Sequence, residues 1–352
     1  MTDITPTFLR DTDHGGDADQ PRRVAQALAD FIQGARSTLH IAIYDFRLGD
    51  DLAGIVIPAL TDAASRGVEV QIAFDHRPDN RSHENALTGD PKPSGTHEFI
   101  PQNFDGSGVQ TRPITAAKLM HNKYVIRDGH TPDAQVWTGS TNFTDDAWTH
   151  QENNILTLAS PPLASFYETD FDELWSTGGI KSTGVNDRGD IQIGGTEVEM
   201  DFSPGDGRII GRTLAALIGA AQTRILVASM MLTSAAVLGA LADALSNNVP
   251  VSGIYDRTQM DGALRQMSEA KIGLFNQIAP SFVSKVSERF SADGKHNFMH
   301  DKVLVSDNVV LTGSFNFSES AMSNAENIVV VHDQGLADQY ATYIKTLIAA
   351  YS

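Results

Sequence analysis

The feature that most constrains this chain is a repeat with a period close to half its length. Residues 120–128 read MHNKYVIRD and residues 299–307 read MHDKVLVSD, so both contain a His-x-Lys-x(4)-Asp pattern. Each copy is followed by Thr-Gly-Ser-x-Asn-Phe, at 138–143 and 312–317, and then by Glu-Asn, at 152–153 and 326–327. A repeat on this scale predicts two related halves that pack against each other.

The segments that precede the two motifs also correspond. In each half a predicted helix leads into a short apolar strand, and a second helix leads into a second strand that ends in aspartate. These elements cover 24–35, 39–44, 52–66 and 68–75 in the first half, and 211–221, 225–230, 235–246 and 249–256 in the second. Helices and strands that alternate in this way predict an α/β protein, and such apolar strands are typical of sheets buried on both faces.

The repeat divides the chain into a first half, residues 1–178, and a second half, residues 199–352. The segment between them, 179–198, is rich in Gly, Ser, Asp and Asn, so we predict a linker there. Another long polar segment, 77–110, precedes the first motif. Loops of this length are commonly functional, and we expect this one to surround the active site and to select the substrate.

Each motif carries an imidazole and an ammonium group two residues apart. At this spacing in a strand, His121 and Lys123 project from the same face, and so do His300 and Lys302. Bringing the two pairs together would create a pocket with two imidazoles and two cations, which suits the negative charge of a phosphodiester at its pentavalent transition state. One histidine would attack phosphorus, and the other would protonate the leaving oxygen and then activate water. The residues alone leave open which histidine does which.

A nucleophilic histidine needs a partner on its other ring nitrogen. A carboxylate in that place fixes the tautomer and the orientation of the ring. Glu152 and Glu326 are the candidates, because each stands at the beginning of an apolar run that is typical of a strand.

The other repeated residues are expected to support this chemistry. Asn142 and Asn316 follow a Gly-Ser turn and are candidates for donating amide hydrogens to phosphate oxygens. Ser140 and Ser314 are candidates for contacting phosphate, for holding the carboxylates or for holding the turn. The motif residues expected to act through a turn or a lysine pair are Asp128, Asp307, Gly139 and Gly313.

With these residues in this order, the sequence resembles the phospholipase D superfamily, whose members carry HKD motifs. The resemblance implies two α/β/α-sandwich halves with mixed central sheets, related by a pseudo-two-fold axis, with the active site at their interface. It also implies a phospho-histidine mechanism without metal or cofactor, in which we favour His121 as the nucleophile and His300 as the acid and base. Single-motif members dimerise to complete a site, so this two-motif chain is expected to act as a monomer. The resemblance further implies that the phosphate is bound by Lys123, Lys302, Asn142 and Asn316, and that Glu152 and Glu326 stand behind the histidines.

Composition narrows the setting of the protein. The net charge of -18 favours solubility and repels polyanions at long range. The chain has no cysteine, so any metal would have to be bound by His, Asp and Glu alone. We see no signal peptide and no run of the ~18 apolar residues that a membrane span requires. We therefore expect a soluble, cytoplasmic protein, and transient contact with a membrane surface is compatible with this.

The substrate is less constrained than the chemistry. A lipid enzyme needs an apolar rim, for which 274–283 and 99–101 are candidates, although ordinary packing also explains each. We favour phospholipase D-type hydrolysis or headgroup transfer on phospholipids; the alternatives are an endonuclease with the same His/Lys site and a non-catalytic phosphate-binding module. A nuclease would need a basic track, and the basic residues near the motifs are Lys118, Arg127, Lys271, Lys285, Arg289 and Lys295, with acidic residues between them.

Overall fold

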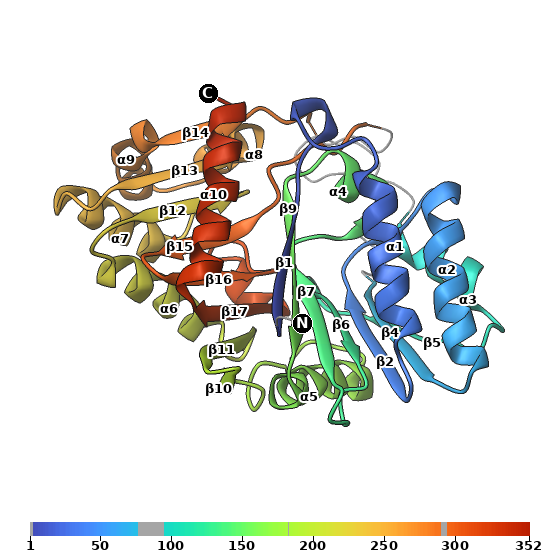
Figure 1. Ribbon diagram of the computed structural model, residues 1–352. Helices are drawn as coiled ribbons and strands as arrows, with labels where there is room; N and C mark the ends of the chain where they lie inside the picture. Colours follow the sequence, from blue (N-terminus) through green and yellow to red (C-terminus); the bar gives the residue numbers. More distant parts are fainter. Residues whose placement is uncertain (1–2, 77–94, 182, 290–293) are drawn as a thin grey trace.

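The computed structural model describes residues 3–76, 95–181, 183–289 and 294–352, and within them it contains two large mixed sheets (Figure 1). The first sheet is formed by residues of the first half only. Its strands, in spatial order, are β1 (Ile4–Leu9), β9 (Asn153–Ala159), β7 (Gln135–Gly139), β6 (Lys123–Arg127), β2 (Thr38–Ile43), β4 (Glu69–Asp75) and β5 (Gln110–Ile114).

The second sheet has the same plan with one strand added at its edge. Its order is β10 (Gly189–Ile193), β11 (Thr196–Ser203), β17 (Glu326–His332), β16 (Val309–Gly313), β15 (Lys302–Ser306), β12 (Ile225–Ser229), β13 (Val251–Asp256) and β14 (Phe282–Lys285). In each sheet three neighbouring strands are parallel, β2-β4-β5 and β12-β13-β14, and the other pairs are antiparallel. The internal repeat of the sequence is therefore a repeat of the fold.

Helices cover both faces of each sheet, and the burial of alternate strand residues explains why. In β2, Leu39, Ile41 and Ile43 pack against the outer helices of the first half, whereas Ala42 joins the core on the inner face. The outer helices are α1 (Gln20–Gln33), α2 (Asp50–Ser65) and α3 (Thr96–Phe104) in the first half, and α6 (Gly207–Ala220), α7 (Ala235–Ser246) and α9 (Glu269–Ile278) in the second.

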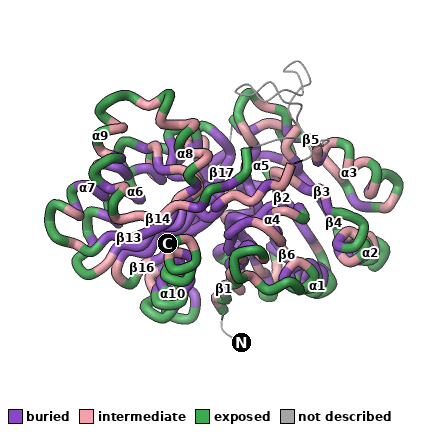
Figure 2. Tube along the Cα trace, turned by 90° about the horizontal axis from the view of Figure 1, so that it is seen from above, coloured by how far each residue is buried: buried purple, intermediate pink, exposed green. Residues whose placement is uncertain are grey.

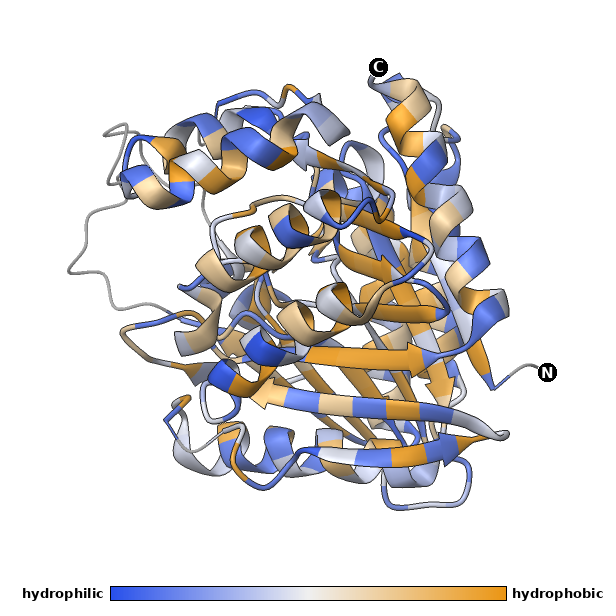
Figure 3. Ribbon diagram, turned by 90° about the vertical axis from the view of Figure 1, so that its left-hand side faces the viewer, coloured by the Kyte–Doolittle hydropathy of each residue, from blue (hydrophilic) through white to orange (hydrophobic). Residues whose placement is uncertain are grey.

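Two long helices lie on the inner faces, α5 (Pro161–Thr177) on the first sheet and α10 (Gln334–Ala350) on the second. Each begins at a side-chain cap: Ser160 accepts from the amide of Leu163, and Asp333 from the amide of Leu336. The residues of both helices belong to one hydrophobic cluster with strands of both sheets, and β7 contacts β16. The two halves therefore share a continuous core, which appears as the buried centre in Figure 2 and as the apolar strands in Figure 3.

The short elements lie near the ends of the central strands. They are β3 (Phe46–Arg47), β8 (Phe143–Thr144), α4 (Asp145–Thr149), α8 (Arg257–Leu264) and the single turns Thr12–His14, Ala279–Ser281 and Ala321–Ser323. In the described residues of the second half, the β3-β8 pair is represented by a single parallel bridge between Leu232 and Phe317, and the single turn Ala321–Ser323 stands where α4 is in the first half. The connection from the Gly-Ser turn to β9, which contains α4, is the longer of the two. This difference decides which residues of the two halves are equivalent.

Most of the predicted helices and strands are confirmed to within a few residues, but two predicted loops contain regular structure. The predicted linker 179–198 contains β10 and the beginning of β11, because an antiparallel hairpin extends the second sheet there. The predicted loop 77–110 contains α3, which buries Ile100 and Phe104 against the first sheet; residues 77–94 lie outside the described residues.

The two segments proposed as an apolar rim are also part of the packed fold. Phe275 and Ile278 are buried in the core of the second half, and Ile100 is buried in that of the first. The other large apolar residues of the two segments, among them Phe99, Leu274 and Phe282, are partly buried against the same cores. In the part of the chain described here, no helix is long and apolar enough to cross a bilayer.

Candidate active site

The two motifs meet where the halves join, and the backbone of each motif is bound to the other half. The amide of His121 donates to the carbonyl of Ala325 at 2.8 Å, and the amide of His300 donates to the carbonyl of Glu152 at 3.1 Å. Parallel bridges at Met120–Ala325 and Met299–Glu152 accompany these bonds. Each histidine therefore lies at the end of a strand of its own half, and its backbone is bound to a backbone segment of the opposite half.

Four cationic or potentially cationic side chains crowd this junction. His121, Lys123, His300 and Lys302 are all buried, with exposures of 0–6%. Lys123 Nζ donates to the carbonyl of His121 at 2.7 Å, and Lys302 donates in the same way to the carbonyl of His300. As the spacing predicts, the side chains of each His/Lys pair lie on one face of the strand, and each lysine contacts the backbone of the histidine two residues before it.

Burial lowers the pKa values of three of these groups, His300, Lys302 and Lys123. Burial is the main reason that the pKa of His300 lies well below its usual range, and the charges of Lys302, Lys123 and His121 lower it further. Burial lowers the pKa of Lys302 to about 7, although Glu326 and Asp301 oppose this shift. The pKa of Lys123 is also held well below its ordinary value, by burial first and by Lys302 in addition. These surroundings favour the loss of protons, and an anion bound there would favour their return.

A carboxylate stands behind His121, as predicted, and it comes from the other half. Oε2 of Glu326 lies 2.6 Å from Nδ1 of His121, and the Glu326 side chain is fully buried. Burial raises the pKa of Glu326 to about 8, although Lys123 and hydrogen bonds from Asn324 and Ser314 oppose the shift. The aromatic ring of Tyr44 meets the His121 ring edge to face, 4.8 Å between centroids, and lies 5.0 Å from Lys123 Nζ.

The group behind His300 is an amide, which corrects the prediction for Glu152. Nδ1 of His300 lies 3.0 Å from Oδ1 of Asn153. The sheet registers explain the difference, because Gly139 pairs with Ile155 as Gly313 pairs with Ile328. Counting back along β9 and β17 from that pair, Asn153 is equivalent to Glu326, and Glu152 is equivalent to Ala325. The repeated Glu-Asn dipeptide is therefore out of register by one residue.

Glu152 instead belongs to a buried ion cluster beside the site. Its Oε2 accepts from Lys285 Nζ at 2.7 Å, and the same ammonium donates to Asp11 Oδ2 at 2.9 Å. The hydroxyl of Tyr351 donates to the other oxygen of Glu152. Among the bonds described, the contact of Glu152 with His300 is made by its backbone carbonyl and not by its side chain.

The motif aspartates hold turns remote from the histidines. Asp128 and Asp307 adopt left-handed φ angles of 54° and 50° at the ends of β6 and β15. Asp128 Oδ1 accepts from the amide of Ser37 at 2.7 Å, and Asp307 Oδ1 accepts from the amide of Thr223 at 2.8 Å. These bonds fix the beginning of β2 and β12, so the turn role predicted for the two aspartates is the one observed.

The Gly-Ser turns bring the neighbouring strand close to the site. A Cβ atom on Gly139 would lie 2.2 Å from the carbonyl oxygen of Asn154, and Gly313 has the same relation to Asn327. Ser140 and Ser314 are fully buried, and their hydroxyls accept from the amides of Asn154 and Asn327 at 3.0 Å. The serines also donate to carboxyl groups, Ser140 to Asp301 and Ser314 to Glu326. Of the three roles predicted for them, the structure therefore shows contacts for holding the turn and for holding carboxyl groups.

Asn142 and Asn316 each have an unpaired atom in the side-chain amide. In the described part of the chain, the Oδ1 atoms of both are buried without a hydrogen-bond partner. Buried polar atoms are rarely left unpaired, so these two need an explanation; a rotation of each amide would direct its NH₂ group, which can donate to phosphate oxygens, to the same place. The two asparagines are equivalent in the repeat, so the same feature occurs twice.

Sequence reasoning missed several residues that surround the site. Tyr44 and Asn153 each have a partner of different chemistry in the other half, so a search for repeated residues could not find them. The residue between His and Lys also differs: Asn122 bonds to Asp170 at 3.1 Å, whereas Asp301 is bonded by Tyr343 at 2.7 Å. The alternation of side chains along a strand was a signal for these residues, because His-Asn-Lys and His-Asp-Lys place a polar side chain on the strand face opposite the His/Lys pair.

These features define a class: a duplicated α/β protein in which two His-x-Lys motifs, one from each half, form a single buried site. The chain belongs to the phospholipase D superfamily, since the family described as "Cardiolipin synthase, PLD-like domain" matches residues 28–175 and 214–348. The fold is similar to that of the phosphatidylserine synthase of Haemophilus influenzae Rd KW20, with a TM-score of 0.64 and 14% identity over 97% of this chain and 88% of that one.

Two curated relatives match shorter parts of the chain. A mitochondrial cardiolipin hydrolase of Chlamydomonas reinhardtii is 27% identical over 146 residues, 42% of this chain and 55% of the relative. A phospholipase D of Rickettsia bellii is 29% identical over 154 residues, 42% of this chain and 68% of the relative. The chain thus spans little more than half of the length of the first relative.

Proposed function

We propose that this protein is a metal-independent phosphodiesterase that acts through a covalent phospho-histidine on His121, with phospholipids as its substrates. The observation that carries this proposal is the difference between the two histidines: a buried carboxylate stands 2.6 Å behind His121, whereas an amide stands behind His300. A histidine that forms a bond to phosphorus becomes positively charged, and a carboxylate stabilises that charge better than an amide does. The same positive charge would favour ionisation of Glu326, whose pKa burial otherwise raises to about 8. The geometry therefore favours His121 as the nucleophile.

The reaction would proceed in two balanced steps. In the first, Nε2 of His121 forms a bond to phosphorus, the bond to the leaving oxygen breaks, and protonated His300 transfers its proton to that oxygen. In the second, neutral His300 takes a proton from water, the hydroxide attacks phosphorus, and the P–N bond to His121 breaks. Burial and neighbouring cations hold the pKa of His300 low, so this mechanism requires the negative charge of the bound phosphate to favour the protonated ring before the leaving oxygen departs.

The cations and amides of the site would bind the non-bridging oxygens. Lys123 and Lys302 supply positive charge that many phosphoryl-transfer sites obtain from a divalent ion. The unpaired amides of Asn142 and Asn316 can turn to donate hydrogen bonds. Among the described residues, a group of His and Asp close enough to hold a metal occurs at Asp11, Asp13 and His150, outside the His/Lys motifs.

The charges around the site favour a phospholipid over a nucleic acid. Four of the basic residues that could have formed a track are engaged with other groups: Lys285 is buried, Lys271 pairs with Glu319, Lys295 pairs with Asp13, and Arg127 donates to a backbone carbonyl of α1. A polynucleotide needs free cations along its backbone, and the chain has a net charge of -18. The names of the two curated relatives, a cardiolipin hydrolase and a phospholipase D, point to the same substrate class.

A burst experiment with bis(p-nitrophenyl) phosphate in EDTA tests the chemistry. The leaving p-nitrophenolate needs no acid, so His300→Ala should release about one equivalent of p-nitrophenol per site and then stop, with the phosphoryl group held on His121. His121→Ala should show neither burst nor turnover, and the exposed His130→Ala should behave as the wild type. A burst in His121→Ala but not in His300→Ala would reverse the assignment, and full dependence on an added divalent metal would contradict the mechanism.

The same variants decide between substrates. Choline release from phosphatidylcholine vesicles that is lost in His121→Ala would support a phospholipase. Cleavage of single- or double-stranded DNA without lipid turnover would make the protein an endonuclease with the same site. Binding of phosphate esters with no turnover in the wild type would leave a phosphate-binding module.

A further inference from the structure

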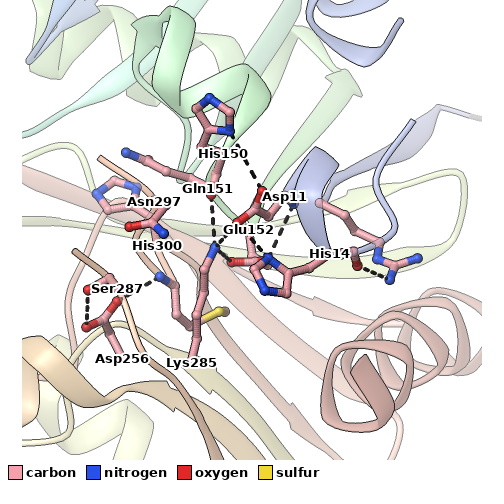
Figure 4. Close-up of polar contacts among 12 residues, drawn as sticks. Asp11, His14, His150, Gln151, Glu152, Asp256, Lys285, Ser287, Asn297 and His300 are labelled. Carbon is pink, nitrogen blue, oxygen red and sulfur yellow. Dashed lines mark hydrogen bonds and ion pairs between the residues drawn. The ribbon is translucent and has the colours of Figure 1, made fainter. Parts of the chain in front are cut away.

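Lys285 lies at the centre of a buried cluster that joins the two halves next to His300 (Figure 4). It comes from β14 in the second half, and its ammonium group is saturated by three acceptors of the first half. These are Asp11 Oδ2 at 2.9 Å, Glu152 Oε2 at 2.7 Å and the carbonyl oxygen of His150 at 2.9 Å. The Lys285 side chain is 1% exposed, and the side chains of the two carboxylates are 0–1% exposed.

The two carboxylates of this cluster accept further hydrogen bonds besides those from Lys285. The amide of Asp11 donates to Glu152 Oε1 at 3.3 Å, and the hydroxyl of Tyr351, which follows α10, donates to the same oxygen. His14 Nδ1 lies 3.0 Å from Asp11 Oδ2. Four chain segments that are distant in sequence are therefore tied together by one ammonium group and two carboxylates.

This cluster reaches the catalytic histidine through two consecutive residues. Glu152 gives its side chain to Lys285 and its backbone carbonyl to the amide of His300. The next residue, Asn153, gives its side-chain oxygen to the His300 ring. Any movement of the backbone at 152–153 would therefore displace both the main chain and the ring of His300.

The equivalent residue of the other half cannot form such a cluster. Ala325 occupies the position equivalent to Glu152, so it has no side-chain oxygen for an ammonium group, and its carbonyl supports His121. Among the described residues, the lysine cluster therefore lies beside His300, whose Nδ1 faces an amide, and not at the equivalent residue beside His121, whose Nδ1 faces a carboxylate. The His300 ring also forms a hydrogen bond with the backbone of Ser140, so its orientation depends on the backbone of the segments around it.

We infer that Lys285 is a positioning residue for His300: through Glu152 it fixes the segment that orients the ring for proton transfer. This inference rests on the proposed function, in which His300 protonates the leaving oxygen. If Lys285 acts in this way, its loss will lower kcat/KM most for esters whose leaving group must be protonated. A lysine that only stabilised the fold would affect all leaving groups alike.

The test compares two esters that differ in the leaving group alone, phosphatidylcholine and phosphatidyl-p-nitrophenol, in mixed detergent micelles. The value of kcat/KM reports the steps up to cleavage of the leaving group. For Lys285→Met we expect kcat/KM on the choline ester to fall at least about tenfold further than on the p-nitrophenyl ester, since a general acid contributes roughly 10²–10⁴-fold for a poor leaving group. His300→Ala sets the upper limit of this selectivity, and the exposed Lys345→Met serves as the control with no change on either ester.

Tyr351→Phe provides a second variant in case Lys285→Met does not fold, because it removes one hydroxyl from Glu152 and no charge. We expect the same selectivity for the choline ester, with a smaller magnitude. Equal losses on both esters, or no loss on either, in the folded variants would overturn the positioning role while leaving the proposed function intact. A wild type that hydrolyses neither ester would overturn the proposed phospholipase function, and the same comparison would then be made with thymidylyl esters of an alcohol and of p-nitrophenol.

Discussion

Two histidines of the same sequence motif have different neighbours, and at the scale of the residue this is the basis on which we propose different roles for them. Nδ1 of His121 faces a carboxyl oxygen of Glu326, whereas Nδ1 of His300 faces the amide oxygen of Asn153. The histidines and lysines themselves were predictable, because they recur in both halves of the sequence. The place of Asn153 was not, because the residue equivalent to it in the other half is a glutamate.

Replacing Glu326 by glutamine tests this difference directly. A glutamine can donate its amide hydrogen to Nδ1 and so favours the wrong tautomer of His121, and we expect kcat to fall by about 10²–10⁴-fold. The burst of p-nitrophenol in the His300→Ala background would slow by a similar factor. The exposed Glu319→Gln, which also removes one carboxylate of the second half, should leave the rate unchanged. A loss below about threefold in Glu326→Gln would remove the basis for naming His121 the nucleophile.

Register is the property that matters at the scale of the element. The helices, strands and motif turns were largely predictable, because their apolar periodicity and their Gly-Ser signals are local. The equivalence of Glu152 with Glu326 was wrong, because α4 adds one residue to the path between Asn142 and β9, and a dipeptide that is repeated by chance masks the insertion. In a strand, a shift by one residue exchanges the two faces, so the carboxylate expected behind His300 is turned toward Lys285.

Gly139 shows how closely the turn and the strand β9 must approach. Its φ angle is 144°, and a methyl group there would lie 2.2 Å from the carbonyl oxygen of Asn154. We expect Gly139→Ala to lower the free energy of unfolding by more than about 2 kcal/mol, because both strain and a backbone clash result. Gly54→Ala in α2 is the matched control: it meets nothing within 4 Å and should stabilise the protein by about 0.5–1 kcal/mol. Thermal unfolding followed by circular dichroism measures both changes.

At the scale of the whole molecule, the two halves share one core, and carboxyl groups are buried within it. Burial raises the pKa values of Asp301 and Asp201 to about 6. A carboxyl with a raised pKa keeps a proton in the folded chain that the unfolded chain has already lost. The stability that it contributes is therefore complete below pH about 4 and is lost as the pH rises through about 6.

Asp301→Asn should remove one such contribution. Asn122 already occupies the equivalent place in the first half, and an amide at 301 could accept from Asn154 and donate to the Tyr343 hydroxyl, which itself donates to the carbonyl of Leu9. Relative to the wild type, we expect the variant to be more stable by up to about 3 kcal/mol at pH 7.5 and nearly equal at pH 4. Urea unfolding at the two pH values measures this difference. The exposed Asp30→Asn should show no such change, and an equal effect of Asp301→Asn at both pH values would contradict the assignment.

Because the partners of each histidine come from the other half, the effects of mutations in the two copies cannot be considered for one half alone. A substitution at position 153 changes the setting of His300, and one at 326 changes that of His121, although each lies outside the half whose motif it serves. If the same residue stood at both positions, the two histidines would have the same Nδ1 partner. A mutation at 153 or at 326 would then distinguish the histidine of the opposite half, and not the histidine of the half that carries the mutation.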